Sequence, residues 1–582
     1  MRKTKIICTI GPASDRPETM AQLLKEGMSV ARLNFSHGDH AEHRRRIETL
    51  RRVALHAEVP LAIMLDTKGP EIRTGNLKNG KVTLQNGQSF TLTARAVPGD
   101  EREVSISYAG LPSEVSPGTS ILLADGLINL TVLSASSTDI VCQVINGGVL
   151  GEKKGVNVPG VRIKLPFLSE KDVEDINFGI DHDIDFIAAS FVRSAGDVLS
   201  IRRILEARDA HIDIIAKIES QSGVDNLDDI IKVSDGITVA RGDLGVEIPA
   251  EEVPLVQKTV MDKCSEYGKP VIIATQMLDS MIKNPRPTRA EVSDVANAIF
   301  DGADAIMLSG ETAAGSYPVE AVQTMARIAA RSEQALPYQE ILRRKRPLGT
   351  ISVTDAISYA TCSAAASLGI SSIITATSIG STARMVAKYR PQADIFAVTT
   401  HPEVVRKLLL IWGVCPVLTR QTQGTDALFE ESLERCLEKG YIKKGDMVVL
   451  TAGSPSGFPG STNLLKVQVV GDILMQGMGI GTRPVSGLVR LIIDETDIED
   501  IREGDILVCK SAYKFLVPKL GKAAAIIAEE GGLTSDAAII GLNMGMPVVV
   551  GAAGATRILQ NDMLVTVDTA HGRIYGGVAK VS

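Results

Sequence analysis

The feature that most constrains the fold is a series of eight short apolar runs separated by segments with helical periodicity. Strands that alternate with helices form parallel sheets, and eight such units close into a barrel. Ser169-x-x-Asp172 and Thr288-x-x-Glu291 have the capping-box pattern that starts a helix. We therefore predict an α/β fold based on a (β/α)8, or TIM, barrel in residues 1–70 and 166–346. The eight runs begin at Lys5, Val30, Leu61, Phe186, Asp213, Gly236, Val271 and Ala305.

The spacing is broken once, between the runs that begin at Leu61 and Phe186. A βα unit takes about 30 residues, so roughly 95 residues are inserted there. The insert reads as short strands with turn signals, and Gly69-Pro70 and Pro166 mark its two ends. We predict a small β domain, a β barrel over residues 71–165, placed as a lid on the carboxyl-end face of the main barrel.

Two further domains are expected after the barrel. Alternating helices and strands resume in residues 347–472, which suits an open α/β sheet. Residues 478–582 are rich in Gly and Val with few long helices, and we interpret them as a separate mobile β/β/α module.

Composition narrows the class of protein. With 44% hydrophobic residues, 23% charged residues and a net charge of −7, the chain is typical of a globular protein and not of a nucleic-acid binder. We find neither a charge-free apolar run long enough to span a membrane nor a signal-peptide pattern. The seven cysteines are scattered without a C-x-x-C pair, which fits a reducing compartment. We expect a cytoplasmic protein without nucleic-acid or membrane partners.

Polar residues gather where six of the eight predicted strands end, which is the face where barrel active sites lie. Glu219 and Asp243 end neighbouring strands and are hard oxygen donors suited to Mg²⁺ or Mn²⁺. Lys217 lies two residues before Glu219, on the same face of its strand. Together with Arg32 and Arg73, Lys217 supplies the cationic groups that phosphoryl transfer needs.

A second group differs in chemistry. It combines neutral oxygens with one carboxylate, which suits a weakly charged second cation, and it comprises Asn34, Ser36, Asp66 and Thr67. Each residue alone has a simpler interpretation. Arg241 or Arg73 could be a salt-bridge partner at the end of the barrel, and Thr275 could be present only because threonine favours β strands. His37 alone is more often a structural histidine. The argument therefore depends on the whole constellation.

These residues lie in segments that closely resemble pyruvate kinase, among them KTKIICTIGPAS, ARLNFSHG, LDTKGPEIRTG, AKIES, VARGDLGVEIP and MLSGETAAGSYP. The segments occur in that family's order from residue 3 to about residue 471. The resemblance implies transfer of a phosphoryl group from phosphoenolpyruvate to ADP, giving pyruvate and ATP in glycolysis. It also implies a homotetramer.

The resemblance assigns roles residue by residue. Glu219 and Asp243 would bind Mg²⁺, and Lys217 would stabilise charge on the migrating group. Substrate contacts would come from Arg32, Lys217, the Gly242 backbone, Asp243 and Thr275, with Thr275 also helping to protonate the enolate. The nucleotide would be bound by Asn34, His37, Arg73 and Lys154, and K⁺ by Asn34, Ser36, Asp66 and Thr67. Glu71 stands where family members that need K⁺ have glutamate, so we expect K⁺ activation.

The loop of residues 377–382 precedes a predicted helix and could cradle a phosphate, although an ordinary strand–helix turn would look the same. In the family this position binds a phosphorylated allosteric effector. Ser378 replaces a lysine found in enzymes similar to those switched by fructose 1,6-bisphosphate. We therefore expect a monophosphate such as AMP or ribose 5-phosphate, bound by Thr377, Ser378, Gly380, Ser381 and Thr382.

The last domain resembles the swivelling phosphohistidine domain of phosphoenolpyruvate synthases, through GGLTSDAA at 531–538 and MPVVVG at 546–551. Asp536 stands where that family has its phosphorylated histidine, so a structural role is favoured. Two other hypotheses remain beside a Mg²⁺- and K⁺-dependent pyruvate kinase. One is a phosphocarrier enzyme that uses this domain. The other is an inactive metabolite sensor, which the intact Lys217, Glu219, Asp243 and Thr275 argue against.

Overall fold

The computed structural model describes residues 1–161, 163–347, 349, 351–422, 424–453, 462–471, 473–512 and 514–579. The expected domain ends at residues 472 and 582 lie outside this set. The chain divides into two compact units, one formed by Met1–Pro337 with Pro402–Pro416 and the other by Tyr338–His401 with Val417–Ser582. In the described part of the chain, no helix has the length and apolar character needed to cross a membrane.

The first unit contains the predicted barrel, which is closed and has the strand order β1-β16-β15-β14-β13-β12-β3-β2. All eight predicted strands are present, and every pair of neighbouring strands in the barrel is parallel. The strands are β1 (Lys5–Thr9), β2 (Met28–Asn34), β3 (Ala62–Asp66), β12 (Phe186–Ala189), β13 (Asp213–Ile218), β14 (Gly236–Ala240), β15 (Val271–Ala274) and β16 (Ala305–Leu308).

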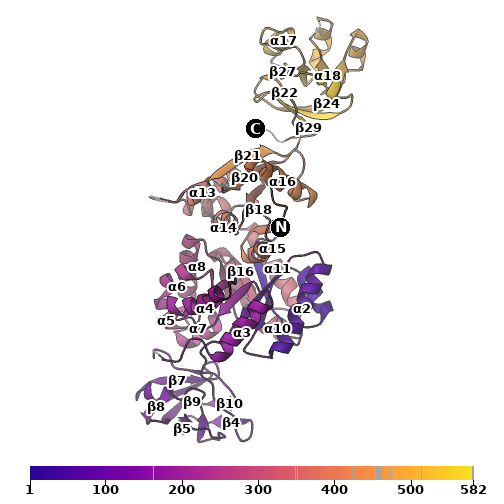
Figure 1. Ribbon diagram of the computed structural model, residues 1–582. Coiled ribbons are helices and arrows are strands. Elements are labelled where there is room, and N and C mark those ends of the chain that lie inside the picture. Colours follow the sequence, from indigo (N-terminus) through magenta and orange to yellow (C-terminus); the bar gives the residue numbers. More distant parts are fainter. Residues whose placement is uncertain are drawn as a thin grey trace. The chain divides into compact units, whose positions relative to one another are not determined.

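Helices surround the barrel strands (Figure 1). Both predicted capping boxes are formed, by Ser169 with Asp172 and by Thr288 with Glu291, so two of these helices begin where the sequence placed them. The helices are α1 (Pro17–Lys25), α2 (His40–His56), α3 (Glu170–Asp181), α4 (Ala195–Ala207), α5 (Gln221–Asp225), α6 (Leu227–Val233), α7 (Arg241–Glu247), α8 (Val253–Tyr267), α9 (Arg289–Asp301), α10 (Gly310–Ala313) and α11 (Pro318–Gln334).

The insert between β3 and β12 is built of β strands, as predicted, with one 3₁₀ turn at Leu111–Ser113. It forms a two-stranded sheet, β10-β4, and a six-stranded sheet, β11-β7-β8-β9-β5-β6, around a separate hydrophobic core. The strands are β4 (Lys81–Leu84), β5 (Ser89–Thr93), β6 (Glu103–Ser105), β7 (Ser120–Leu123), β8 (Ile128–Ala135), β9 (Asp139–Asn146), β10 (Gly148–Gly151) and β11 (Val156–Asn157).

Residues Pro402–Pro416 lie late in the sequence but pack with the barrel. Leu409 and Leu410 belong to the hydrophobic cluster formed by inward residues of the barrel strands. Lys407 Nζ lies 2.7 Å from a carboxylate oxygen of Asp213, the first residue of β13. The segment contains α15 (Pro402–Lys407) and a 3₁₀ turn (Leu408–Leu410), and it fills the end of the barrel opposite the predicted site.

The second unit begins with the predicted α/β sheet. Its strands β18, β17 and β20 are parallel, and β21 pairs antiparallel with β20. The chain re-enters this unit within β19 (Val414–Leu418). The other elements are α12 (Tyr338–Arg344), α13 (Val353–Ser367), β17 (Ser372–Ala376), α14 (Ser381–Ala387), β18 (Asp394–Thr399), α16 (Thr425–Glu438), β20 (Met447–Ala452) and β21 (Leu464–Val469).

The last part of the chain forms one mixed sheet with the order β22-β29-β28-β24-β25-β26-β27-β23. The strands are β22 (Ile473–Gln476), β23 (Met478–Ile480), β24 (Val485–Ile492), β25 (Ile506–Cys509), β26 (Ala525–Ala528), β27 (Val548–Val550), β28 (Leu564–Asp568) and β29 (Arg573–Gly576), with helices α17 (Asp536–Met544) and α18 (Ala555–Ile558).

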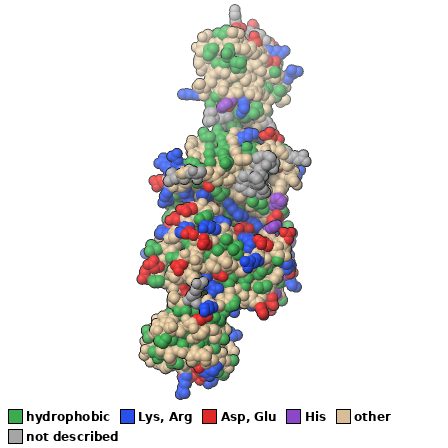
Figure 2. Space-filling view, turned by 60° about the vertical axis from the view of Figure 1, so that its left-hand side comes forward, with side chains coloured by type: hydrophobic (Ala, Val, Ile, Leu, Met, Phe, Trp, Pro, Cys, Tyr) green, Lys and Arg blue, Asp and Glu red, His purple; other side chains and the backbone are tan. Residues whose placement is uncertain are grey.

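Charged side chains of both signs are intermingled over the part of the surface that carries the barrel helices (Figure 2). On this face, neither sign of charge is gathered into one patch.

Candidate active site

The candidate site is built on the carboxyl ends of β2, β3, β12 and β13. The register pairs Asn34 at the end of β2 with Asp66 at the end of β3. Ser36 and Thr67 follow these two residues, so the four predicted K⁺ ligands come from one pair of adjacent strands. The Oδ1 of Asn34 accepts a hydrogen bond from the Ser36 backbone N–H at 3.0 Å.

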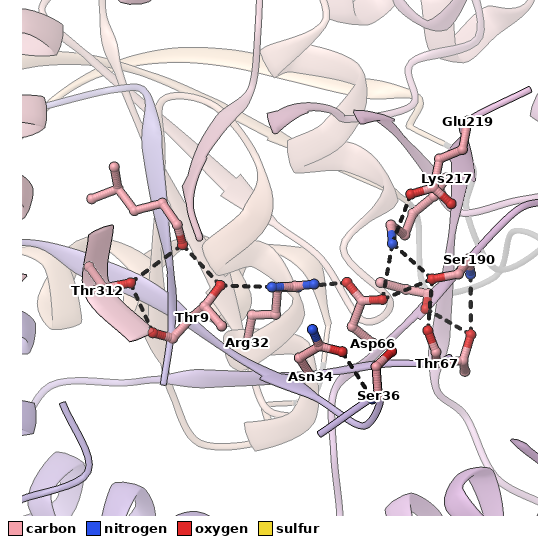
Figure 3. Close-up of polar contacts among 12 residues, drawn as sticks. Thr9, Arg32, Asn34, Ser36, Asp66, Thr67, Ser190, Lys217, Glu219 and Thr312 are labelled. Carbon is pink, nitrogen blue, oxygen red and sulfur yellow. Dashed lines mark hydrogen bonds and ion pairs between the residues drawn. The ribbon is translucent and has the colours of Figure 1, made fainter. Parts of the chain in front are cut away.

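Lys217 is the centre of the buried polar network (Figure 3). Its Nζ lies 2.8 Å from Ser190 Oγ, 2.9 Å from Glu219 Oε1 and 3.2 Å from Asp66 Oδ1. Ser190 and Asp66 accept hydrogen bonds from this ammonium group, and Glu219 forms an ion pair with it. Burial lowers the pKa of Lys217, but the two carboxylates outweigh burial and hold that pKa above its ordinary value. Lys217 is therefore a fixed positive charge.

Arg32 shares the carboxylate of Asp66 with Lys217. Arg32 Nε lies 2.6 Å from Asp66 Oδ2, and Arg32 Nη1 donates to Thr9 Oγ1 at 2.9 Å. Burial raises the pKa of Asp66, but Arg32 and Lys217 together hold it below its usual range. One ionised carboxylate thus orients two cations at the end of β3 (Figure 3).

Glu219 and Asp243 form a second, less compensated charge cluster. Burial, with the nearby negative charge of Asp243, raises the pKa of Glu219 to about 7, although Lys217 opposes the shift. Burial also raises the pKa of Asp243, against the effect of Lys217. Among the described residues no group of three or more His, Cys, Asp or Glu side chains could hold a metal ion. The buried Glu219 and the half-buried Asp243 together fit Mg²⁺, which typically takes one or two carboxylates and fills its remaining positions with water and substrate oxygens.

Thr275 follows β15 in a strained backbone conformation. Its φ is +68°, which is a genuine outlier for a β-branched residue and is typical of functional sites. The Thr275 hydroxyl accepts from the Gly242 N–H at 2.7 Å and donates to the Ala274 carbonyl at 2.6 Å. The structure therefore brings together Thr275 and Gly242, two predicted substrate contacts from adjacent strands.

Two of the polar residues at strand ends, Arg241 and Glu311, stabilise neighbouring loops. Arg241 lies 2.7 Å from a carboxylate oxygen of Asp294 and donates to the Thr275 carbonyl at 2.9 Å, which is the salt-bridge role left open by the sequence. Glu311 accepts hydrogen bonds from the backbone N–H groups of Leu278 and Ser309 at 3.0 and 2.8 Å. These two side chains hold the loops around the site.

The predicted nucleotide residues of the lid lie close together. Arg73 Nε lies 2.7 Å from Glu71 Oε2, and Arg73 Nη1 donates to the Lys153 carbonyl at 3.1 Å. The backbone N–H of Lys154 donates to Thr74 Oγ1 at 2.9 Å. Asp243 is among the charges that raise the pKa of Arg73, after the hydrogen bond to Glu71.

The lid is also connected to the barrel near the site. Asn157 Nδ2 donates to Glu247 Oε1 at 2.8 Å, and Glu247 lies on α7, the helix that carries Asp243. His37, the predicted nucleotide contact in the barrel itself, is exposed, and its carbonyl accepts from His43 Nε2 at 2.9 Å.

The predicted effector loop lies in the second unit. The Gly380 N–H donates to Thr377 Oγ1 at 2.9 Å, and Gly380 has a φ of +84°, which favours glycine. Ser378 is exposed and Ser381 is half-buried. Thr382 is buried, and its hydroxyl accepts from Thr462 Oγ1 at 2.9 Å.

In the last sheet, Asp536 is exposed at the first position of α17, and the Ser535 hydroxyl caps that helix. The resemblance had placed the phosphorylated histidine of other enzymes at this position.

Two site residues were missed by the sequence analysis. Thr9 ends β1 and Ser190 directly follows β12, which are the two strands to which no polar end had been assigned. Both carry hydroxyls bonded to the predicted cations Arg32 and Lys217. A search for hydroxyl residues at the ends of all eight strands would have found them.

Comparisons with known proteins find relatives that match this chain over its whole length. Family models match residues 1–322 (pyruvate kinase, barrel domain), 355–468 (pyruvate kinase, alpha/beta domain) and 501–572 (PEP-utilising enzyme, mobile domain). The pyruvate kinases of Geobacillus stearothermophilus and Bacillus licheniformis are each 53% identical, with 100% of both chains covered. A crystal structure of a pyruvate kinase from Cryptosporidium parvum is 41% identical, with a TM-score of 0.76 over 81% of this chain and 96% of that chain.

Proposed function

This chain belongs to the pyruvate kinase family, and from that premise we propose how its residues transfer a phosphoryl group from phosphoenolpyruvate to ADP. The enzyme is a phosphotransferase, and its family uses a metal cofactor. In the reaction, the bond between phosphorus and the enol oxygen of phosphoenolpyruvate breaks. A new bond forms between phosphorus and a β-phosphate oxygen of ADP. The enolate that remains takes up a proton on carbon and becomes pyruvate.

Glu219 and Asp243 would hold Mg²⁺ or Mn²⁺, because they are neighbouring carboxylates of the site whose pKa values are both raised by burial. When bound, the metal supplies positive charge beside the carboxylate and phosphate of the substrate. Lys217 and Arg32 would stabilise the negative charge that develops on the transferred group and the enolate oxygen. Asp66 keeps both cations in place.

Thr275 and the Gly242 backbone would contact the substrate, and the Thr275 hydroxyl would help water to deliver the proton to the enolate. The Thr275 hydroxyl is already oriented by Gly242 N–H and the Ala274 carbonyl. Preorganised groups of this kind cost no reorganisation during the reaction.

The nucleotide phosphates would be bound by Arg73 and Lys154 from the lid and by His37 and Asn34 from the barrel. The neighbouring oxygens of Asn34, Ser36, Asp66 and Thr67 would hold K⁺, which adds positive charge near the phosphates. Glu71 supports a K⁺ requirement, because a glutamate there supplies no cation of its own.

The effector loop would bind a monophosphate such as AMP or ribose 5-phosphate. Its hydroxyls and the turn at Gly380 suit one phosphate group, and residues 377–382 contain no lysine or arginine that would pair with a second. If a titration found that only fructose 1,6-bisphosphate activates, this assignment would be wrong.

The last domain is proposed to have a structural role, and the active form to be a homotetramer. An aspartate in place of histidine would have to form an acyl phosphate to act as a carrier. Labelled phosphoenolpyruvate should therefore leave Asp536 unlabelled. Sedimentation of the full chain would test the tetramer.

The observation that carries the proposal is the position of Lys217, which is held by Ser190, Asp66 and Glu219 at the end of the barrel where Asp243 also lies. A lactate dehydrogenase-coupled assay with phosphoenolpyruvate and ADP tests it, with and without Mg²⁺ and K⁺. Lys217→Met should lower kcat by about 10²–10³-fold or more, because it removes charge stabilisation from the transition state. If the wild-type protein forms no pyruvate when Mg²⁺ and K⁺ are both present, the proposed function is wrong.

A further inference from the structure

Ser190 has no role in the catalysis proposed above, yet its hydroxyl is at the centre of the site. The residue is 3% exposed, and its single hydroxyl proton can reach the Thr67 carbonyl at 2.7 Å or Asp66 Oδ1 at 3.1 Å. Both of these acceptors belong to the end of β3. The Ser190 proton therefore points toward β3, and the oxygen lone pair is left to accept from Lys217 Nζ at 2.8 Å.

The backbone fixes Ser190 in this place. The next residue, Phe191, has a φ of +53°, and its N–H donates to Glu219 Oε2 at 2.6 Å. A left-handed aromatic residue is strained and persists only where its surroundings hold it. The segment at Gly69 also packs closely against Ser190. A Cβ added to Gly69 would lie 2.9 Å from Ser190 Cβ, which leaves no room for a larger residue at Gly69.

The turn after β12 therefore contacts two functional residues, one through a side chain and the other through the backbone. The Ser190 side chain contacts the lysine, whereas the Phe191 backbone contacts the proposed metal ligand Glu219. Resting on the roles proposed above, we propose that Ser190 is a positioning residue for Lys217. Its hydroxyl fixes the direction of the ammonium group between Asp66 and Glu219, so that the charge faces the transferred phosphoryl group.

Ser190→Ala removes this acceptor and leaves the backbone contact to Glu219 in place. We expect kcat to fall about 10- to 100-fold, the loss typical of one hydrogen bond to a charged group. The KM for phosphoenolpyruvate should change less than about threefold. The affinity for Mn²⁺, followed by electron paramagnetic resonance without substrate, should stay within about twofold of the wild-type value, because Phe191 still holds Glu219. A serine that merely supported the whole site would weaken Mn²⁺ binding as well.

Ser234→Ala is the matched control. Its hydroxyl is also buried and donates to a backbone carbonyl, that of Ile230, at 2.7 Å, but it lies before β14 at the opposite end of the barrel. This control should keep the wild-type kcat, with thermal unfolding recorded for both variants. The proposal is overturned if Ser190→Ala keeps kcat within twofold, or if kcat and Mn²⁺ affinity fall together. An inactive wild type would instead overturn the proposed function itself.

Discussion

Asp66 and Lys217 form an ion pair, with 3.2 Å between Oδ1 and Nζ, although β12 separates their strands in the barrel. The pair crosses the barrel end because both residues stand near the carboxyl ends of their strands, on the faces that point into the barrel. Ser190, from the intervening strand, contacts both residues. The cations of the site are thus held by a network and not by single pairs.

Replacing Asp66 should damage both activity and stability. Asp66→Asn leaves Arg32 and Lys217 buried without their shared negative charge, and breaking a buried ion pair costs about 3–5 kcal/mol. We expect kcat to fall more than about 100-fold and the calorimetric unfolding temperature to drop. Asp185→Asn is the control, since this buried carboxylate pairs with Arg51 and Arg406 at the opposite end of the barrel. It should lose stability while the folded enzyme keeps its kcat, and equal losses of kcat in both variants would contradict the prediction.

Metal affinity should depend on pH through Glu219. The pKa of Glu219 is raised to about 7, so in the metal-free protein this carboxyl stays largely protonated up to about pH 7. A metal cation must therefore displace that proton when it binds. Mn²⁺ affinity should therefore rise from pH 6 to pH 8 and fall by up to about tenfold per pH unit below 7. Titration calorimetry in two buffers should detect proton release at pH 6 and less at pH 8.

Glu247→Gln is the control for this pH dependence. Glu247 is another carboxyl whose pKa burial raises, but it accepts a hydrogen bond from Asn157, which glutamine can also do. This variant should keep the pH dependence of Mn²⁺ affinity. A flat pH profile in the wild type would show that Glu219 does not exchange a proton for the metal.

A lysine at position 71 should replace K⁺. Glu71→Lys brings an ammonium group to the lid, so activity should become largely independent of K⁺. The substitution also breaks the pair between Glu71 and Arg73, and Glu71→Gln separates the two effects. The glutamine variant should still need K⁺. Activity measured with K⁺ or with a large organic cation tests both variants, and an unchanged K⁺ requirement in Glu71→Lys would refute the charge-substitution account.

A negative charge in the effector loop should prevent activation. Ser378 is exposed, so Ser378→Asp can be accommodated, but its carboxylate would repel a phosphate. The ratio of activities with and without ribose 5-phosphate or AMP should fall to about one. Ser371→Asp, which adds the same charge at the exposed position just before β17, should keep the wild-type ratio. Retained activation in Ser378→Asp would place the effector elsewhere.

Much of the fold could be predicted because its signals are local. Strand periodicity and helix caps depend on neighbouring residues, so the eight barrel strands and the helix starts at Ser169 and Thr288 were found correctly. The position of Lys217 beside Glu219 was predictable for the same reason, because residues two apart on a strand share a face.

The remaining features depend on residues far apart in the chain. Thr9 and Ser190 have ordinary β-strand neighbours, and nothing local indicates that their hydroxyls meet Arg32 and Lys217. In the same way, Pro402–Pro416 follow an α/β pattern in the sequence, yet they pack with the barrel.

The sequence by itself determined which side chains stand at the carboxyl ends of the strands, and therefore the chemistry available. Only the tertiary structure decided how these charges are shared: Asp66 between two cations, Lys217 among Asp66, Glu219 and Ser190, and Arg241 with Asp294. The physical reason is that barrel closure fixes distances between strand ends that are separated by up to about 300 residues. Ion pairs and hydrogen bonds depend on those distances, and short-range periodicity does not contain them.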